Sequence, residues 1–105
     1  MTGHRVLPGV PALYAATKHA LRVLTDGLRN ELAAEKSPIK VSLISPGLVD
    51  TPWHSLPDGI VSSKGGYPHE PLDTQDIVDA VHYILSTPPR VQVSDILLRP
   101  IAQPF

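Results

Sequence analysis

The chain has 105 residues, of which 42% are hydrophobic and 18% are charged, a composition typical of one folded domain of modest size. Its formal net charge of −1 provides no basic field, so nucleic acid and anionic membrane surfaces are not expected partners. The sequence has no cysteine, which excludes disulfides and thiolate metal sites and fits a reducing compartment. Without a signal-peptide core or a run of about 20 apolar residues, we expect a cytoplasmic chain with no membrane span.

A long amphipathic helix is predicted from Pro11 to about Glu35. Pro11 suits the first turn of a helix, where its missing N–H leaves no bond unmade. The helix ends at Lys36-Ser37-Pro38, and no proline interrupts it before that point. Gly27 in its middle indicates a place where another backbone or helix comes close. The apolar stripe recurs every four residues, at Ala16, Ala20, Leu24, Leu28 and Leu32.

Residues 39–45 predict a strand, because apolar and polar side chains alternate there until Pro46-Gly47 stops the pattern. The following segment, residues 48–71, contains four prolines and three glycines and has no sustained period. A connection of this length without secondary structure is unusual inside a compact domain. We therefore interpret residues 48–71 as a functional lid or substrate loop.

A second helix and a second strand follow. Asp73 or Thr74 caps the helix, which stops at Pro88-Pro89. The strand begins near residues 91–93 and ends before Pro100, and the tail after it gives no signal. The two strands with the helix between them form a β-α-β unit, which predicts that the strands are parallel.

Tyr14 and Lys18 are four residues apart and share one face of the first predicted helix. A unit positive charge about 4 Å from the phenol is worth about 4 kcal/mol at an effective dielectric of about 20, which favours the phenolate. The pair is therefore a candidate proton donor, and an exposed helix pair without a function is the alternative. Because crossover helices run antiparallel to the strands they cover, Tyr14, Lys18 and Pro46-Gly47 are predicted to converge at the sheet edge where α/β folds bind ligands.

Two motifs resemble the short-chain dehydrogenase/reductase family. Residues 14–18 read YAATK and resemble its Y-x-x-x-K motif, while residues 46–51 read PGLVDT and resemble its P-G-x-V-x-T motif. Residues 3–8 and 95–100 are similar to the subgroup that contains dehydrogenase/reductase member 11 and the insect farnesol dehydrogenases. The resemblance implies an α/β fold, the C-terminal half of a Rossmann-type doubly wound parallel sheet, with residues 1–105 forming one partial domain.

The resemblance also implies hydride transfer between NAD(P)H and a carbonyl, or the reverse reaction with an alcohol. Tyr14 would be the general acid in reduction and the base in oxidation, and Lys18 would also hold the nicotinamide ribose. The backbone at Val49 would meet the nicotinamide carboxamide, and Thr51 would lie by the phosphates. The subgroup favours NADP over NAD and implies a small hydrophobic carbonyl or alcohol substrate. The family's cofactor-binding positions correspond here to Tyr14, Lys18, Pro46, Gly47, Val49 and Thr51.

Trp53, His54 and Leu56 lie in the long loop, where family members close over their substrate. These side chains line a substrate pocket or, as the alternative, pack the loop on itself. The five histidines of the chain show no i, i+4 pairing with a carboxylate partner. No metal site is therefore expected.

The chain also departs from the family. Its seven glycines form no G-x-x-x-G-x-G or G-x-G-x-x-G motif, so the loop that cradles the cofactor's pyrophosphate, and with it the N-terminal dinucleotide-binding half, is expected to be absent. Gly3 fits the glycine of the family's S-x-x-G motif, but the serine would fall immediately before Met1, and Thr2 is the only nearby hydroxyl. Such departures are typical of a truncated gene model or an internal start, and we expect the chain to be inactive by itself.

Two strands and two helices leave apolar surface and strand edges open, which predicts marginal stability as a monomer. In the family, the first helix belongs to a four-helix bundle between subunits. The resemblance therefore implies a homo-oligomer formed through the Leu24–Gly27–Leu28 region. The alternative to an enzyme fragment is a non-catalytic chain that associates with itself or with full-length relatives.

Overall fold

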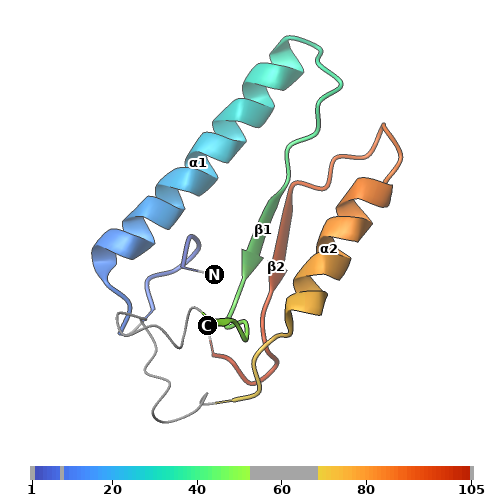
Figure 1. Cartoon of the computed structure of the whole chain (residues 1–105). Helices are drawn as coiled ribbons and strands as arrows, with labels where there is room; N and C mark the ends of the chain where they lie inside the picture. Colours follow the sequence, from blue (N-terminus) through green and yellow to red (C-terminus); the bar gives the residue numbers. More distant parts are fainter. Residues whose placement is uncertain (1, 8, 53–68, 105) are drawn as a thin grey trace.

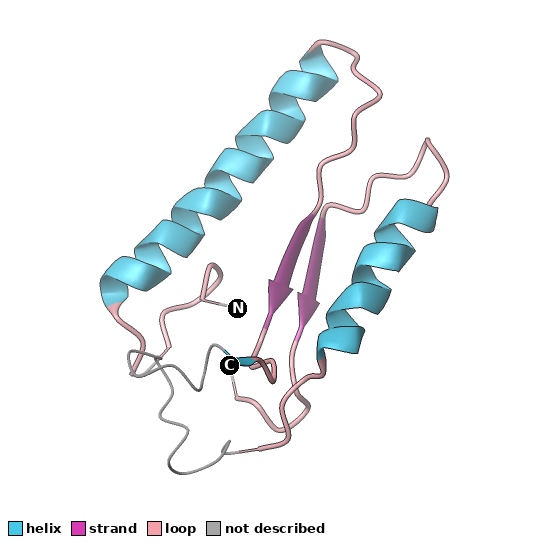
Figure 2. Cartoon of the chain, in the orientation of Figure 1, coloured by secondary structure: helices cyan, strands magenta, loops and turns pink. Residues whose placement is uncertain are grey.

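The computed structural model describes residues 2–7, 9–52 and 69–104. Its elements follow the order α1 (Ala12–Ala34), β1 (Leu43–Pro46), α2 (Thr74–Ser86) and β2 (Asp95–Leu98). The two strands are parallel and paired, with β1 and β2 in one sheet that runs between the two helices (Figures 1 and 2). Leu43 lies opposite Asp95, and Pro46 lies opposite Leu98. The predicted β-α-β unit with parallel strands is therefore confirmed.

The helix α1 begins directly after Pro11 and has no side-chain cap at its N-terminus. Its first intrahelical bond runs from the N–H of Ala15 to the carbonyl of Pro11 at 3.1 Å. At the other end, Lys36 has a left-handed φ of 54°. The N–H of Lys36 bonds the Ala33 carbonyl and the N–H of Ser37 bonds the Leu32 carbonyl, the pattern of a Schellman motif. The predicted helix is confirmed almost to the residue.

The helix α2 is capped at its N-terminus by a reciprocal pair of aspartates. The Asp73 carboxylate accepts the backbone N–H of Gln75 at 3.2 Å, and the Asp76 carboxylate accepts the backbone N–H of Asp73 at 2.8 Å. Of the two caps that the sequence allowed, Asp73 and Thr74, this capping box selects Asp73. Beyond the last turn, the Lys40 ammonium bonds the Thr87 carbonyl at 3.1 Å and the Thr87 hydroxyl at 2.9 Å, which ties the end of α2 to the segment before β1.

The strand predicted over residues 39–45 and the strand predicted to begin near 91–93 are both shorter than expected. Residues 39–42 and 91–94 lie outside the ladder, and side chains bond the backbone groups of Val41 and Val93 there. The Gln92 amide bonds both the N–H and the carbonyl of Val41, at 3.1 and 2.8 Å, as a neighbouring strand would. The Ser42 hydroxyl donates to the Val93 carbonyl at 2.7 Å.

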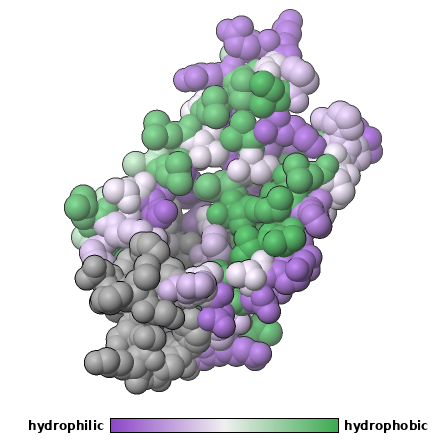
Figure 3. Space-filling model, viewed as in Figure 1, coloured by the Kyte–Doolittle hydropathy of each residue, from purple (hydrophilic) through white to green (hydrophobic). Residues whose placement is uncertain are grey.

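Few side chains of the described residues are buried, and no large side chain among them is fully buried. Ala15 on α1 and Ala80 on α2 are the buried hydrophobic residues among them, and Ser45 on β1 is a buried polar residue. Apolar residues instead gather at the surface along α1, as Figure 3 shows. Leu13, Val23 and Leu24 of this helix are 78%, 68% and 69% exposed. Marginal stability of the monomer stays a prediction, and a core of this size supports it.

Arg29 is the main polar link between α1 and the sheet. Its guanidinium donates from Nε to the Val41 carbonyl at 2.8 Å and from Nη2 to the Asp95 carboxylate at 3.1 Å. Nη2 also bonds the Ser94 carbonyl, and Nη1 pairs with Asp26 on α1 itself. One side chain thus joins α1 to the segments that lead into both strands. No helix within the described ranges is both long and apolar enough to cross a membrane.

Candidate active site

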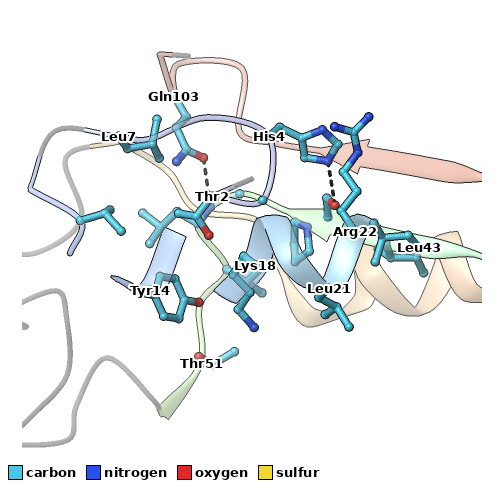
Figure 4. A pocket seen from close by; sticks show the side chains of 18 residues that line it. Thr2, His4, Leu7, Tyr14, Lys18, Leu21, Arg22, Leu43, Thr51 and Gln103 are labelled. Carbon is cyan, nitrogen blue, oxygen red and sulfur yellow. Dashed lines mark hydrogen bonds between the residues drawn. The ribbon is translucent and has the colours of Figure 1, made fainter. Parts of the chain in front are cut away.

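A cavity of about 400 Å³ opens at the carboxyl end of β1, between the start of α1 and the N-terminal segment. The loop after β1 and one tail residue complete its wall, as the close view in Figure 4 shows. Its volume is within the range of small-molecule sites. The lining residues are Thr2, Gly3, His4, Leu7, Val10, Tyr14, Lys18, Leu21, Arg22, Leu43, Ile44, Ser45, Pro46, Gly47, Leu48, Val49, Thr51 and Gln103.

Tyr14 and Lys18 line this cavity together, from the first two turns of α1. The Lys18 ammonium lies 5.4 Å from the centroid of the Tyr14 ring, within the range of a cation–π contact. Tyr14 is 36% exposed, so its phenol is open to a ligand as well as to Lys18. The structure therefore brings together the two residues that the motif singled out.

The loop after β1 reaches the same cavity. Pro46 is the last residue of β1, and Gly47, Val49 and Thr51 follow it along the wall. Val49 forms an isolated parallel bridge with Leu72, supported by bonds of 2.9 Å from Asp50 N–H to the Leu72 carbonyl and from Leu72 N–H to the Leu48 carbonyl. The four predicted cofactor-binding residues of this loop thus lie on one wall, and the two from α1 lie on another.

Gly3 explains how the N-terminal segment reaches the cavity. A Cβ placed on this residue would lie 2.8 Å from the backbone oxygen of Lys18, closer than real Cβ contacts allow. The absence of a side chain lets the segment pass directly against the first turns of α1. Thr2 and Gly3 therefore both stand in the lining.

His4, Arg22 and Ser45 form a polar cluster that the sequence did not indicate. The ring nitrogen Nε2 of His4 lies 3.0 Å from the Ser45 hydroxyl, which links the N-terminal segment to β1. Burial, followed by the positive charge of Arg22, lowers the pKa of His4 below its ordinary value. The Arg22 Nε atom is buried and has no hydrogen-bond partner within the described residues. No short-range pattern relates residues that are 41 positions apart, so only the fold reveals this contact.

Gln103 is a second residue that sequence reasoning missed. It lies in the tail, to which the sequence pattern gave no role, and its side chain reaches the loop after β1. The three substrate-loop residues Trp53, His54 and Leu56 lie outside the described residues. In the part of the chain that the structure describes, no three His, Asp or Glu side chains are grouped to hold a metal ion.

The chain matches known dehydrogenases in sequence and in structure. The family model described as short chain dehydrogenase matches residues 1–56. Farnesol dehydrogenase of Aedes aegypti is 42% identical over 106 residues, and dehydrogenase/reductase SDR family member 11 of Mus musculus is 45% identical over 109 residues. These alignments cover 100% and 98% of this chain but only 41% of each relative.

A solved structure, the closed form of serine dehydrogenase complexed with NADP+, superposes with a TM-score of 0.73 at 25% sequence identity. The match covers 88% of this chain and 38% of that one. The fold is therefore part of a Rossmann-type α/β sheet, and the chain spans about two fifths of the length of the relatives that it matches. Since the family model covers more than half of its residues, the chain belongs to the short-chain dehydrogenase family.

Proposed function

We propose that these 105 residues form the catalytic-helix and substrate-loop part of an NAD(P)-dependent oxidoreductase, acting on a carbonyl or alcohol substrate. One observation carries the proposal. Tyr14 and Lys18 on α1 line the same cavity as the loop after β1. A phenol beside an ammonium, facing backbone groups at the carboxyl end of a parallel strand, is a suitable arrangement for proton transfer next to a bound nucleotide.

The proton in this reaction passes through Tyr14. When a carbonyl is reduced, the Tyr14 hydroxyl donates its proton to the carbonyl oxygen while the carbon receives a hydride, and an alcohol results. In the reverse direction, the Tyr14 phenolate accepts the hydroxyl proton. Lys18 stabilises the phenolate by its positive charge. NAD(P)H supplies the hydride when it is bound.

The donors of the cavity fit the nicotinamide end of such a cofactor. Among the described residues, its lining holds the Lys18 ammonium and the Thr51 hydroxyl but no carboxylate, so none of these lining side chains brings a negative charge against a phosphate or ribose oxygen. Lys18 would hold the ribose, the backbone at Val49 the carboxamide, and Thr51 the phosphate nearest to the ring. We propose NADP rather than NAD, in keeping with the NADP+ complex of serine dehydrogenase.

The substrate in this proposal is small and hydrophobic. Besides its polar groups the cavity is lined by Leu7, Val10 and Leu21, which offer apolar contact close to Tyr14. The relative from Aedes aegypti is named for farnesol, an apolar alcohol, which makes farnesol the first substrate to test. A cytoplasmic site of action belongs to the same proposal and is supported by the absence of cysteine.

A chimera tests the proposal directly. In it, this chain replaces the aligned 41% of Aedes aegypti farnesol dehydrogenase, so that the relative supplies the remaining residues. We expect the chimera to oxidise farnesol with NADP and the 105-residue chain alone to show no turnover. The matched variant Lys18→Met should lose most of the activity. A folded chimera that binds NADP but has no activity would contradict the proposal.

Self-association through α1 is a second proposal, and it rests on the exposed side chains of that helix. Leu24 and Leu28 are 69% and 44% exposed, and a Cβ on Gly27 would meet no atom within 4 Å. No helix of this chain therefore fills the space beside Gly27 in the described residues, and a second copy is the occupant that we propose. Sedimentation velocity should show a dimer that Leu24→Lys converts to a monomer. A monomeric unchanged chain at high concentration would contradict this proposal.

A further inference from the structure

Gln103 is held at the cavity by the backbone around it. The N–H of Gln103 donates to the Pro100 carbonyl at 3.1 Å, which closes a turn directly after β2. Its own carbonyl accepts a bond from the Arg99 guanidinium. Since β2 is paired with β1, this turn carries the Gln103 side chain to the loop that follows β1.

The side-chain oxygen of Gln103 is fixed on that loop. The Leu48 N–H donates to Oε1 at 3.0 Å, and a Cβ placed on Gly47 would lie only 2.2 Å from the same oxygen. The amide group therefore lies directly against the Gly47 backbone. Because only an acceptor can pair with an N–H, this bond also determines which end of the amide is oxygen and which is nitrogen.

The amide nitrogen of Gln103 is a donor that the described residues leave available. Within residues 2–7, 9–52 and 69–104, Nε2 has no hydrogen-bond partner. Gln103 lines the same cavity as Tyr14 and Lys18, and Figure 4 shows its side chain reaching in from the tail, on the side away from the Tyr14 phenol. A half-buried amide with two N–H groups at a cavity wall is suited to a carbonyl oxygen of a ligand.

We propose that Gln103 binds the nicotinamide carboxamide, with Nε2 donating to the carboxamide oxygen while Oε1 holds the Leu48 N–H. The carboxamide is favoured over the substrate carbonyl because Leu48 precedes Val49, whose backbone we assign to the same group. This inference rests on the proposed function and adds a side-chain contact to it. It also gives the tail after β2 a role in cofactor binding.

Titration of the 105-residue chain with reduced nicotinamide riboside tests the proposal. This uncharged probe carries the ring, the carboxamide and the ribose but no phosphate. Backbone and side-chain amide NMR signals of Val49 and Gln103 report its binding. Gln103→Glu keeps an acceptor for Leu48 but loses the donor, whereas Gln103→Met loses both. We expect both variants to raise the Kd by about 3- to 10-fold, the effect of one hydrogen bond.

Hydrogen exchange of the Leu48 amide separates binding from loop structure. It should stay slow in Gln103→Glu and become faster in Gln103→Met. The matched control Gln75→Glu makes the same substitution on the exposed face of α2, away from the cavity, and should leave the Kd unchanged. A Gln103→Glu variant that binds the probe as tightly as the unchanged chain would overturn the proposal, and so would an unchanged chain that does not bind the probe.

Lys18→Met distinguishes this inference from the proposed function. If Lys18→Met weakens probe binding and Gln103→Glu does not, the nicotinamide site stands and the role of Gln103 is wrong. If only Gln103→Glu weakens binding, the carbonyl contact stands and the assignment of Lys18 to the ribose is wrong. If both weaken it, both proposals are supported.

Discussion

The β1–α2–β2 unit and the helix α1 are held by different kinds of bonds. The unit has a backbone ladder and a capping box on α2, and the Gln92 side chain extends the strand pairing. The Lys40 side chain ties the end of α2 to the segment before β1. The helix α1 is attached to the rest of the molecule mainly by two contacts. Arg29 bonds the backbone next to the sheet, and Gly3 of the N-terminal segment lies against the backbone of Lys18. The candidate active site lies between the two regions, so its shape depends on the weaker attachment. The distance between Tyr14 and the loop after β1 is therefore determined by the contacts of Arg29 and Gly3, which lie outside both sequence motifs.

Among the substitutions that test this difference, replacing Arg29 should change the free energy of unfolding most. The Arg29 side chain is only 14% exposed, and its removal takes away the donor of the Asp95 carboxylate. The Val41 carbonyl keeps its bond from Gln92 and the Ser94 carbonyl keeps its bond from the Leu43 N–H, so each loses one of two donors. We expect Arg29→Met to lower the free energy of unfolding by about 2–3 kcal/mol, the range for hydrogen bonds to charged groups. Urea unfolding followed by circular dichroism measures this change.

The comparison predicts where the loss appears. In Arg29→Met, amide hydrogen exchange should accelerate more in α1 than in β1 and β2. The control Arg90→Met removes an exposed arginine after α2 and should change stability by less than about 0.5 kcal/mol. Equal acceleration in both regions would mean that the molecule opens as one unit and that the distinction between them is wrong.

Gly3→Ala should have the next largest effect. The added methyl group would meet the Lys18 backbone oxygen at 2.8 Å, so the N-terminal segment must move away from α1. We expect a loss of about 1–2 kcal/mol, within the range for overpacking. The matched control Gly27→Ala, measured at a protein concentration at which the chain is monomeric, adds the same methyl group where no atom lies within 4 Å, and it should stabilise α1 by about 0.5–1 kcal/mol. Thermal unfolding of both variants shows whether their changes in stability have opposite signs. Changes of the same sign would contradict the close approach of Gly3 to the Lys18 backbone.

Asp73→Ala tests the other region. The substitution removes the acceptor for the Gln75 N–H and should cost about 1 kcal/mol, as loss of an N-cap does. Amide hydrogen exchange should become faster within α2 and stay unchanged in α1. Asp73→Asn keeps the acceptor and serves as the control. An unchanged stability in Asp73→Ala would show that α2 is held by its packing and not by its cap.

Protonation of His4 should have the smallest effect on stability, and this effect appears only as the pH falls. The pKa of His4 is below its ordinary value of 6.5 because of burial and the Arg22 charge, with His19 adding to the decrease and Asp95 opposing it. The unfolded chain therefore takes up the proton more readily, so stability decreases as pH falls below about 6.5 toward the lower folded pKa. Urea midpoints between about pH 5 and 8 should show this slope, and His4→Gln should reduce it. An equal slope in the variant would exclude His4 as its source.

The sequence predicted the elements of the fold because their signals are local. Pro11, the Asp73 cap and the apolar period of residues 12–35 each act within a few residues, and they located both helices. The strand starts were predicted too early, since the pattern over 39–45 cannot show that the Gln92 side chain will occupy the backbone of Val41. A side chain that replaces a strand leaves no periodic signal.

The candidate site was predicted from its motifs but not from its supports. The YAATK and PGLVDT segments are continuous, so Tyr14, Lys18 and the loop after β1 could be found in the sequence. Gln103 and His4 reach the same cavity through contacts 55 and 41 residues away in the chain, and no spacing rule connects them to the motifs. These long-range contacts depend on the parallel pairing of β1 and β2 and on the close approach of Gly3 to the Lys18 backbone.

The central claim is that Tyr14 transfers the proton in the proposed reaction. Its most direct test is the farnesol oxidation rate of the chimera with Tyr14 and with Tyr14→Phe, measured at saturating NADP. The substitution removes only the hydroxyl, so the variant should still bind NADP while its turnover falls by about 10²- to 10⁴-fold, the usual contribution of a general acid or base. A Tyr14→Phe chimera that turns over at the rate of its parent would contradict the account.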